Sequence, residues 1–479
     1  MRVLFVSAEV APYSKTGGLA DVAAALPAAL ADLGQDVMVV TPLYDTIDPR
    51  EHRLHLVYED IEVRVGDKQV AFSARLAPDG RTWFIDLPDL YHRGSIYTQD
   101  RDEHLRFLLL TRAAFELCRH RQWSPDIAHG NDWHTGFLPL LLRSVYVGDN
   151  LFRDTQSVFT IHNLAYQGWF DAGILPDLGL GAQQYLLHQD HLRQGHINFM
   201  EHALLYADLL TTVSPTYAWE IQTPELGAGL DFILRKRSHD LVGILNGIDT
   251  TVWNPETDRH LFAPYSALDM AGKQHNKRAL LLETGLEDET IPLVGIVSRL
   301  TAQKGIELLI RPIARLLELD AVRFVGIGTG EKKYEEALVW LSHRYPGKAQ
   351  FLPVYDERLA HLIEAGADMF AMPSRYEPSG LNQMYSLAYG TPPIVRRTGG
   401  LADTVRHYDP ATGDGNGFAF EHYSEEGFHW ALGEAVRLFP DRDLWERLQQ
   451  NGMSEDNSWE RRAGEYLAAY QTVMENVDQ

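Results

Sequence analysis

Short apolar runs recur along the chain, each followed by a polar loop and then by apolar residues at helical spacing. The first such set is the run Val3–Val6, the loop Ser7–Gly18, a helix that Gly34 ends, and the run Val37–Val40. Continuous apolar runs are typical of buried parallel strands, and a 3.6-residue repeat is typical of amphipathic helices. This order of strand, loop, helix and strand predicts the opening of a doubly wound α/β domain.

The same rhythm begins again in the second half of the chain. Leu293–Val297 is predicted to be a strand, Ile306–Leu317 a helix, and Arg323–Gly326 the next strand. Residues 248–276 between the halves are irregular and polar, as expected of a crossing between domains. We therefore predict one domain over residues 1–247 and a second over 248–457, with a C-terminal helical segment, about 458–479, that packs back on the first.

One stretch of the first half has a different pattern. Residues 52–98 alternate between apolar and polar positions, which predicts antiparallel strands within Ile61–Val65, Val70–Ala74 and Thr82–Leu87. We interpret this stretch as an insertion or as the edge of the first sheet.

Charge and cysteine content narrow the function classes. The 479 residues carry 43 basic and 66 acidic side chains, a net charge of −23, which argues against nucleic acid and anionic membranes as partners. Cys118 is the only cysteine, so the chain cannot form an intramolecular disulfide and a reducing, cytoplasmic location is expected. The first apolar run is too short for a signal peptide, and no uncharged run approaches membrane-spanning length.

The stretch Arg375–Gln383 has the most distinctive chemistry. It follows the apolar run Met369–Met372 and precedes a predicted helix over Leu381–Ala388, so Glu377 and Gly380 lie on a strand-to-helix turn. The first N–H groups of a helix attract anions, which makes an adjacent carboxylate unexpected. A sugar diphosphate explains both, because its anion meets the helix and its hydroxyl groups meet Glu377. An ordinary capped turn is the alternative.

Two further loops carry cations in an otherwise acidic chain. Lys15 precedes Gly17-Gly18 at the start of the first helix, while Arg299 and Lys304 share one strand-to-helix loop. Such groups are suited to a phosphate, although a plain turn or surface charge would also explain them. His134 and His162 follow two other predicted strands, at the sheet edge where ligands of α/β proteins bind.

Other patterns are weaker. Gly326–Gly330 is one residue short of the dinucleotide fingerprint, which disfavours a nicotinamide-dependent oxidoreductase. The triplets Asp100–Asp102 and Asp441–Asp443 do not follow buried strands, so solvated charge is the better interpretation. The spacing of four histidines, and the lack of cysteines near them, argues against a structural zinc, and we predict no metal. These are His188, His191, His196 and His202.

The sequence resembles bacterial glycogen synthase and plant starch synthase over essentially its whole length. The motifs that carry the resemblance are Lys15–Leu19, Asn131–His134, Thr160–Leu164, Asn246–Asp249, Ser298–Leu300 with Lys304-Gly305, and Arg375–Gln383. The resemblance implies the glycosyltransferase-B fold, in which two Rossmann-like domains face each other across a deep cleft. It also implies transfer of glucose from a nucleotide sugar, usually ADP-glucose, to the non-reducing end of an α-1,4-glucan, with retention of configuration and no cofactor.

The resemblance also implies roles for individual residues. It places Lys15, Arg299 and Lys304 on the donor diphosphate, and His162, Asn246 and Glu377 around the glucose. It implies backbone contacts to the diphosphate from Gly18, Gly380 and Leu381, stacking of Tyr355 on adenine, and a cleft lined by Asp21 and Glu9. Two departures are Ser379, where many members have cysteine, and His104, where asparagine is expected. A UDP-glucose-dependent enzyme and a non-catalytic glucan-binding protein are the alternatives.

Overall fold

The structure is a computed structural model that describes residues 1–66 and 68–475. It divides the chain into two compact units, which we call the first and the second unit. The first unit comprises Met1–Asn246 and the segment that begins at Trp459, and the second comprises Gly247–Ser458. Among the described residues, no helix is both long enough and apolar enough to cross a membrane.

The first unit is built on a nine-stranded sheet of order β11-β10-β7-β6-β1-β2-β5-β4-β3. Its strands from β11 to β5 are parallel, whereas β4 is antiparallel to both β5 and β3. The predicted antiparallel pairing is therefore confirmed, with β3 and β4 at the edge of the sheet, whereas β5 also pairs in parallel with β2. The strands are β1 (Arg2–Val6), β2 (Asp36–Pro42), β3 (His55–Val65), β4 (Lys68–Leu76), β5 (Thr82–Asp86), β6 (Ile127–Asn131), β7 (Gln156–Ile161), β10 (Leu209–Thr212) and β11 (Leu241–Gly243).

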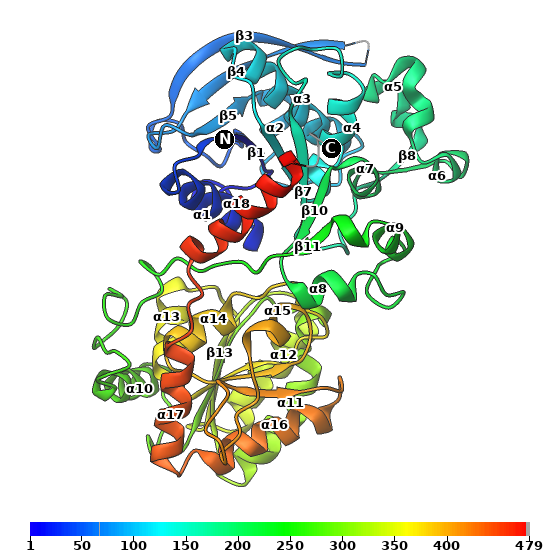
Figure 1. Ribbon diagram of the computed structural model, residues 1–479. Helices are drawn as coiled ribbons and strands as arrows, with labels where there is room; N and C mark the ends of the chain where they lie inside the picture. The colour runs from blue at the N-terminus through cyan, green and yellow to red at the C-terminus, as the bar shows by residue number, and fades with distance from the viewer. Residues whose placement is uncertain (67, 476–479) are drawn as a thin grey trace. The chain divides into compact units, whose positions relative to one another are not determined.

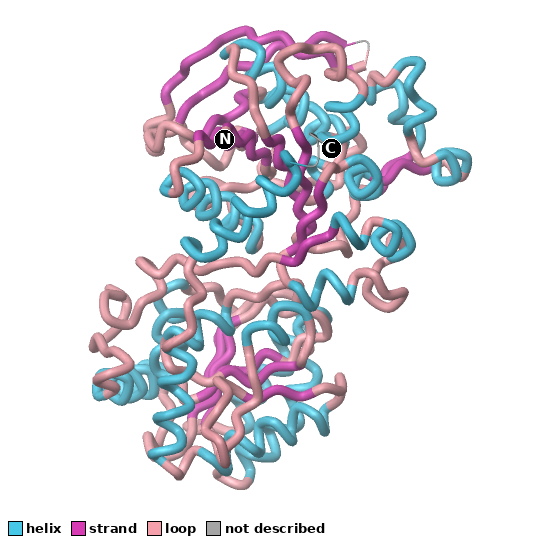
Figure 2. Tube along the Cα trace, viewed as in Figure 1, coloured by secondary structure: helices cyan, strands magenta, loops and turns pink. Residues whose placement is uncertain are grey.

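Helices cover both faces of this sheet (Figures 1 and 2). Alternate residues of β1 point to opposite faces, so that Leu4 and Val6 belong to one apolar cluster and Val3 and Phe5 to another. The helices are α1 (Gly18–Asp32), α2 (Pro88–Tyr91), α3 (Glu103–Arg121), α4 (Leu138–Arg143), α5 (Leu175–Leu178), α6 (Gln189–Arg193), α7 (Phe199–Tyr206), α8 (Pro215–Glu220), α9 (Asp231–Lys236) and α18 (Trp459–Glu475). A short separate ribbon pairs β8 (Trp169–Asp171) with β9 (His196–Asn198).

The C-terminal helix α18 packs beside α1, as Figure 1 shows in red and blue. Its buried face presents Trp459, Tyr466 and Tyr470 to the cluster that contains Phe5. The Tyr470 hydroxyl lies 2.6 Å from Nδ1 of the fully buried His129 on β6. The last helix of the chain is therefore part of the core of the first unit.

The second unit has a six-stranded, all-parallel sheet of order β14-β13-β12-β15-β16-β17. Phe324 and Val325 on β13 enter separate apolar clusters, so this sheet is also buried on both faces. The elements are α10 (Ala271–Thr284), β12 (Leu293–Val297), α11 (Ile306–Glu318), β13 (Arg323–Ile327), α12 (Lys332–Arg344), β14 (Ala349–Leu352), α13 (Glu357–Gly366), β15 (Met369–Met372), α14 (Asn382–Ala388), β16 (Pro393–Arg396), α15 (Gly399–Thr404), β17 (Phe418–Phe420), α16 (Glu425–Leu438) and α17 (Arg442–Met453). The predicted α/β class is confirmed, with a largely parallel sheet in the first unit and an all-parallel sheet in the second.

Candidate active site

Most of the predicted site residues follow the carboxyl ends of parallel strands, where open α/β sheets bind their ligands. In the first unit they follow β1, β7 and β11, and in the second they follow β12, β14 and β15. Each unit therefore presents a set of polar side chains along one edge of its own sheet.

Glu9 organises the glycine-rich loop after β1. Its carboxylate is 3% exposed and accepts hydrogen bonds from the Thr16 N–H at 2.5 Å, the Thr16 hydroxyl at 2.6 Å and the Gly17 N–H at 3.3 Å. The Tyr97 hydroxyl also donates to it, and burial together with the Glu9 charge raises the pKa of Tyr97 well above its usual value. The Glu9 carboxylate is thus occupied by the loop, which makes Glu9 a positioning residue.

Lys15 lies at the exposed side of the same loop. Its Nζ is 2.7 Å from Oδ1 of Asp21, on the first turn of α1, and the lysine side chain is 49% exposed. Gly18 is the first residue of α1, directly beyond the cap residue Gly17. A cation and the start of a 15-residue helix therefore lie together, as the sequence predicted.

His162 is held in one tautomer by its neighbours. Asn131 donates from Nδ2 to the Val6 carbonyl at 3.1 Å, so its Oδ1 faces His162 Nε2 at 2.9 Å. Nε2 must then carry the proton, and Nδ1 is left as an acceptor. Burial lowers the pKa of His162 to about 3, so the ring is neutral at physiological pH. A neutral ring with Nδ1 as acceptor can receive a hydrogen bond from a sugar hydroxyl.

Asp132 and His134 support this arrangement from inside the protein. Asp132 Oδ1 accepts the His162 N–H at 2.8 Å, and burial raises the pKa of Asp132 to about 7. His134 is buried and stacks on Tyr97 with ring centroids 4.8 Å apart. The structure therefore assigns His134 a packing role, unlike His162.

Asn246 is the last residue of the N-terminal segment of the first unit. It is 5% exposed, and its Oδ1 accepts no hydrogen bond from the described residues. A buried carbonyl oxygen without a donor costs free energy, and a ligand hydroxyl would remove that cost. Of the predicted glucose-binding residues, Asn246 and His162 thus each offer an acceptor.

In the second unit, the structure pairs two predicted site residues. Lys304 Nζ lies 2.6 Å from Oε2 of Glu377, which is 5% exposed and also accepts from the Ser374 hydroxyl at 3.1 Å. Arg299, on the same loop as Lys304, is exposed, and its guanidinium has no hydrogen-bond or ion-pair partner among the described residues. One cation is therefore neutralised by Glu377, and the other is available to an anion.

Glycines bring a second loop against the Glu377 turn. A Cβ on Gly400 would lie 2.0 Å from the Ser379 carbonyl oxygen, and one on Gly399 would lie 2.0 Å from that of Glu377. The Gly400 N–H donates to the Glu377 carbonyl at 3.1 Å. The start of α15 is thus in backbone contact with the turn and fixes its shape.

Backbone N–H groups just before α14 are available to a ligand. Gly380 has φ 71°, in the left-handed region that favours glycine, and α14 begins at Asn382 with Leu381 as its cap residue. The N–H groups of Gly380 and Leu381 donate to no acceptor among residues 1–66 and 68–475. Tyr355 lies beyond the end of β14 and is 70% exposed.

The two family departures differ in setting. Ser379 is 5% exposed, and its hydroxyl has no partner among the described residues. His104 lies on α3, is 4% exposed, and places Nε2 3.0 Å from Oδ2 of Asp177. Ser379 therefore adjoins the candidate site, and His104 belongs to a partly buried pair with Asp177, 73 residues away.

The weaker patterns have structural explanations. Asp100 and Asp102 both pair with Arg93, at 3.1 and 2.6 Å. Gly328 allows close backbone approach, because a Cβ there would lie 2.0 Å from the Ser298 carbonyl oxygen. Tyr97 and Asn131 are positioning residues. Neither was assigned a role from the sequence, although Asn131 begins the motif Asn131–His134 of the family resemblance.

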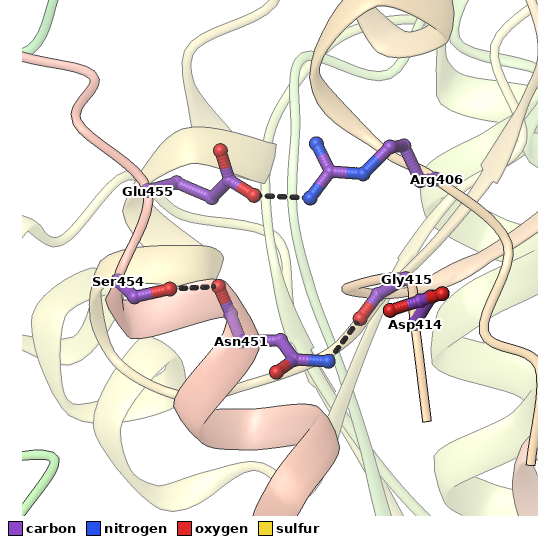
Figure 3. Close-up of a pocket in the computed structure, with 6 residues that line it drawn as sticks. All are labelled: Arg406, Asp414, Gly415, Asn451, Ser454 and Glu455. Carbon is purple, nitrogen blue, oxygen red and sulfur yellow. Dashed lines mark hydrogen bonds and ion pairs between the residues drawn. The ribbon is translucent and has the colours of Figure 1, made fainter. Parts of the chain in front are cut away.

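A polar pocket of about 240 Å³ in the second unit contains none of the predicted site residues. Figure 3 shows it between α17 and the loop around Gly415, with Arg406 paired to Glu455 and Asn451 bonded to the Gly415 carbonyl. The charges that line it are thus largely satisfied by one another.

Two family patterns match the chain in the regions of these sites. The pattern described as "Starch synthase catalytic domain" covers residues 2–236, and "Glycosyl transferases group 1" covers residues 280–453. Each unit is an α/β unit with polar groups at the carboxyl ends of its parallel strands. Together with the two matching family patterns, this arrangement defines a glycosyltransferase of the GT-B class.

Relatives that match the chain along its full length identify the family within this class. A protein named glycogen synthase from Anaeromyxobacter dehalogenans (strain 2CP-C) is 46% identical over 479 residues, or 99% of this chain and 100% of the relative. The one from Koribacter versatilis (strain Ellin345) is 45% identical over 483 residues, or 99% of each. The solved catalytic domain of starch synthase IV from Arabidopsis thaliana, bound to ADP and acarbose, is 36% identical with a TM-score of 0.91 and 99% coverage of both chains. The chain belongs to the glycogen and starch synthase family.

Proposed function

We propose that this chain transfers glucose from ADP-glucose to the non-reducing end of an α-1,4-glucan with retention of anomeric configuration. The observation that carries the proposal is the turn after β15, where the buried carboxylate of Glu377, its partner Lys304 and the spare N–H groups of Gly380 and Leu381 lie together. A carboxylate beside an anion site is suited to a ligand with hydroxyl groups at one end and phosphates at the other. The similarity to a starch synthase solved with ADP and acarbose supports the same ligand classes.

The donor diphosphate is assigned to three cations and three backbone donors. Lys15, Arg299 and Lys304 supply positive charge, and Gly18, Gly380 and Leu381 supply N–H groups. Charge-assisted hydrogen bonds of this kind contribute about 1.5–3 kcal/mol each. Their effect on rate is larger where charge accumulates on the departing group in the transition state. Tyr355 is assigned to the adenine ring, for which an exposed aromatic face is suited.

The glucose is assigned to three hydrogen-bond acceptors. His162 offers Nδ1, Asn246 offers Oδ1, and Glu377 offers a carboxylate whose charge Lys304 balances. Each can accept a hydrogen bond from a sugar hydroxyl. Asp21, paired with Lys15, and Glu9, which shapes the loop, support the diphosphate side of the site.

The proposed reaction breaks the bond between the anomeric carbon and the diphosphate oxygen, and ADP leaves with the bonding electron pair. The sugar passes through an oxocarbenium-like state, which Glu377 stabilises by its charge. The 4-hydroxyl oxygen of the acceptor then bonds to the anomeric carbon from the face that ADP left. Its proton passes to a phosphate oxygen of ADP, so no protein nucleophile is needed.

The test is transfer of labelled glucose onto glycogen, with ADP-glucose and UDP-glucose supplied separately and without added metal. Label incorporated from ADP-glucose is the expected result. Label from UDP-glucose alone would overturn the adenine assignment at Tyr355. Glycogen binding without transfer from either donor would identify a non-catalytic glucan-binding protein and contradict the proposal.

The cellular setting follows from the composition of the chain. The only cysteine, Cys118, is buried and unpaired, and the net charge is −23. We infer a cytoplasmic enzyme whose partners are ADP-glucose and glucan, with neither nucleic acid nor membrane among them.

A further inference from the structure

A second cluster of chemically active side chains lies in the first unit, around the ribbon of β8 and β9 and the short helix α6 (Figure 1). His188 is the cap residue of α6, His191 lies within it, and Glu201 lies on the first turn of α7. The sequence predicted no metal site from the histidine spacing alone. The fold changes that picture because it brings Glu201, ten residues beyond His191, against both imidazoles.

The three side chains form a compact set. His191 Nδ1 lies 2.9 Å from Glu201 Oε2, and His188 Nδ1 lies 3.5 Å from Glu201 Oε1. One ligand atom from each residue can be chosen so that all three lie within 4.8 Å of one another. The Glu201 side chain is 0% exposed, and each imidazole is 23% exposed.

The hydrogen bonding of the cluster is incomplete among the described residues. Oε1 of Glu201 is buried and accepts no hydrogen bond from the described residues. The nearby His188 Nδ1 accepts the His191 N–H at a long 3.4 Å, so its single lone pair would bind a metal in exchange for this weak hydrogen bond. Two acceptor atoms therefore face each other at 3.5 Å. Burial of a carboxylate oxygen without a donor is unfavourable, and a cation between the two atoms removes the cost.

We propose that His188, His191 and Glu201 form a structural binding site for a divalent transition metal, with Zn²⁺ as the preferred ion. Two imidazoles and one carboxylate are suited to Zn²⁺, whereas Ca²⁺ and Mg²⁺ prefer oxygen ligands alone. Zinc ligands at about 2.0–2.2 Å in a tetrahedron lie about 3.3–3.6 Å apart. The 3.5 Å between His188 Nδ1 and Glu201 Oε1 matches that spacing. The 2.9 Å between His191 Nδ1 and Glu201 Oε2 is a hydrogen-bond distance, which lengthens when a metal replaces the proton. The exposed side of the imidazoles leaves the fourth position to water.

The surrounding residues support the ligands and are not ligands themselves. His202 uses both ring nitrogens, since Nε2 accepts the His188 N–H at 3.1 Å and Nδ1 lies 2.6 Å from the Asn198 carbonyl oxygen. Asn198 accepts the Glu201 N–H at 3.0 Å, and its own Nδ2 donates to Gln167 Oε1 at 2.7 Å. A bound metal would thus tie the ribbon to the loop that begins at His162 and ends near Gln167.

Metal binding by the untagged, chelator-treated full chain tests this proposal. Zn²⁺ affinity is measured by competition with a chromogenic chelator, and Co²⁺ is added as a spectroscopic probe of tetrahedral coordination. One Zn²⁺ per chain is expected to bind at this site, with tetrahedral Co²⁺ absorption and a higher Tm on Zn²⁺ addition. Loss of a ligand in His191→Ala or His188→Ala is expected to weaken binding by more than the 10–100-fold typical of an outer-shell change.

His196→Ala is the matched control, because His196 lies on β9 beside Trp169 and is exposed, yet is outside the cluster. It is expected to bind Zn²⁺ like the parent chain. Glu201→Gln is a third test. If this change at a buried position prevents folding, the His188→Ala and His191→Ala variants still test the proposal, because both imidazoles are partly exposed. Absence of Zn²⁺ binding in the parent chain would overturn the proposal. So would equal affinity in the parent and His191→Ala, which would indicate scattered binding by the other histidines.

Discussion

Replacement of Lys304 by alanine tests both the stability and the chemistry assigned to the turn after β15. Lys304 Nζ is 2.6 Å from Glu377 Oε2, and the Glu377 side chain is 7% exposed. Without the lysine, Oε2 keeps, among partners in residues 1–66 and 68–475, only the Ser374 hydroxyl, which donates to it at 3.1 Å. The variant therefore loses one cation of the proposed diphosphate site and leaves a buried carboxylate with little compensation.

The two effects differ in size and can be measured separately. Removing one partner of a fully buried ion pair costs about 3–5 kcal/mol. The Lys304 side chain is 19% exposed, so we expect a smaller loss of unfolding free energy, near the about 1.5–3 kcal/mol of a charge-assisted hydrogen bond. If Lys304 also stabilises the departing diphosphate, kcat is expected to fall about 10²–10³-fold, equivalent to about 2.7–4 kcal/mol.

The assay is the initial rate of glucose transfer from saturating ADP-glucose to glycogen, together with urea unfolding of the same preparation. A group that acts only in the transition state lowers kcat and kcat/KM equally. Lys348→Ala is the control, because Lys348 precedes β14 at the opposite end of the sheet and pairs with the exposed Asp320 at 2.8 Å. Its loss is expected to cost at most about 1 kcal/mol and to leave kcat unchanged. A Lys304→Ala enzyme that folds and keeps kcat within a few-fold of the parent would refute the reasoning.

Three further changes test other parts of the structure. His129→Gln removes a buried imidazole whose pKa burial lowers to about 3. The unfolded imidazole gains a proton below about pH 6.5 while the folded one does not. Between pH 7 and 5 the unfolding free energy of the parent chain is therefore expected to fall by about 2 kcal/mol relative to that of the variant. A difference in unfolding free energy, measured with urea, that stays the same at both pH values would contradict this. Gly400→Ala is expected to lower both Tm and activity, because its Cβ would lie 2.0 Å from the Ser379 carbonyl oxygen, whereas Gly464→Ala on α18 has open space and is expected to be neutral or stabilising. Ser379→Ala is expected to keep or raise Tm, since the buried hydroxyl has no partner among the described residues, and a loss above about 1 kcal/mol would reveal an unrecognised contact.

The sheets could be predicted because local sequence determines them. The run Val3–Val6 is wholly apolar, with β-branched and aromatic residues, so burial on both faces of a parallel sheet follows directly. The loop motifs at Lys15, Arg299 and Glu377 could be identified for the same reason, because each follows such a run. The resemblance then gave the class of ligand.

The pairings within the sites could not be predicted, because they join residues that are distant in sequence. Glu9 meets the hydroxyl of Tyr97, 88 residues away, and Lys304 meets Glu377, 73 residues away. The histidine cluster shows the same limit. The spacing of His188 and His191 indicated no zinc site, and only the packing of α7 beside α6 supplies Glu201.

The packing of α18 against α1 has a consequence for the order in which the protein is made. The first unit needs both ends of the chain, because Tyr470 and Phe5 share one apolar cluster. The second unit is continuous from Gly247 to Ser458 and is complete before Trp459 is synthesised. During translation, the apolar cluster that the sheet and α1 share with α18 therefore stays incomplete until α18 leaves the ribosome. The segment synthesised second is the first that can finish folding.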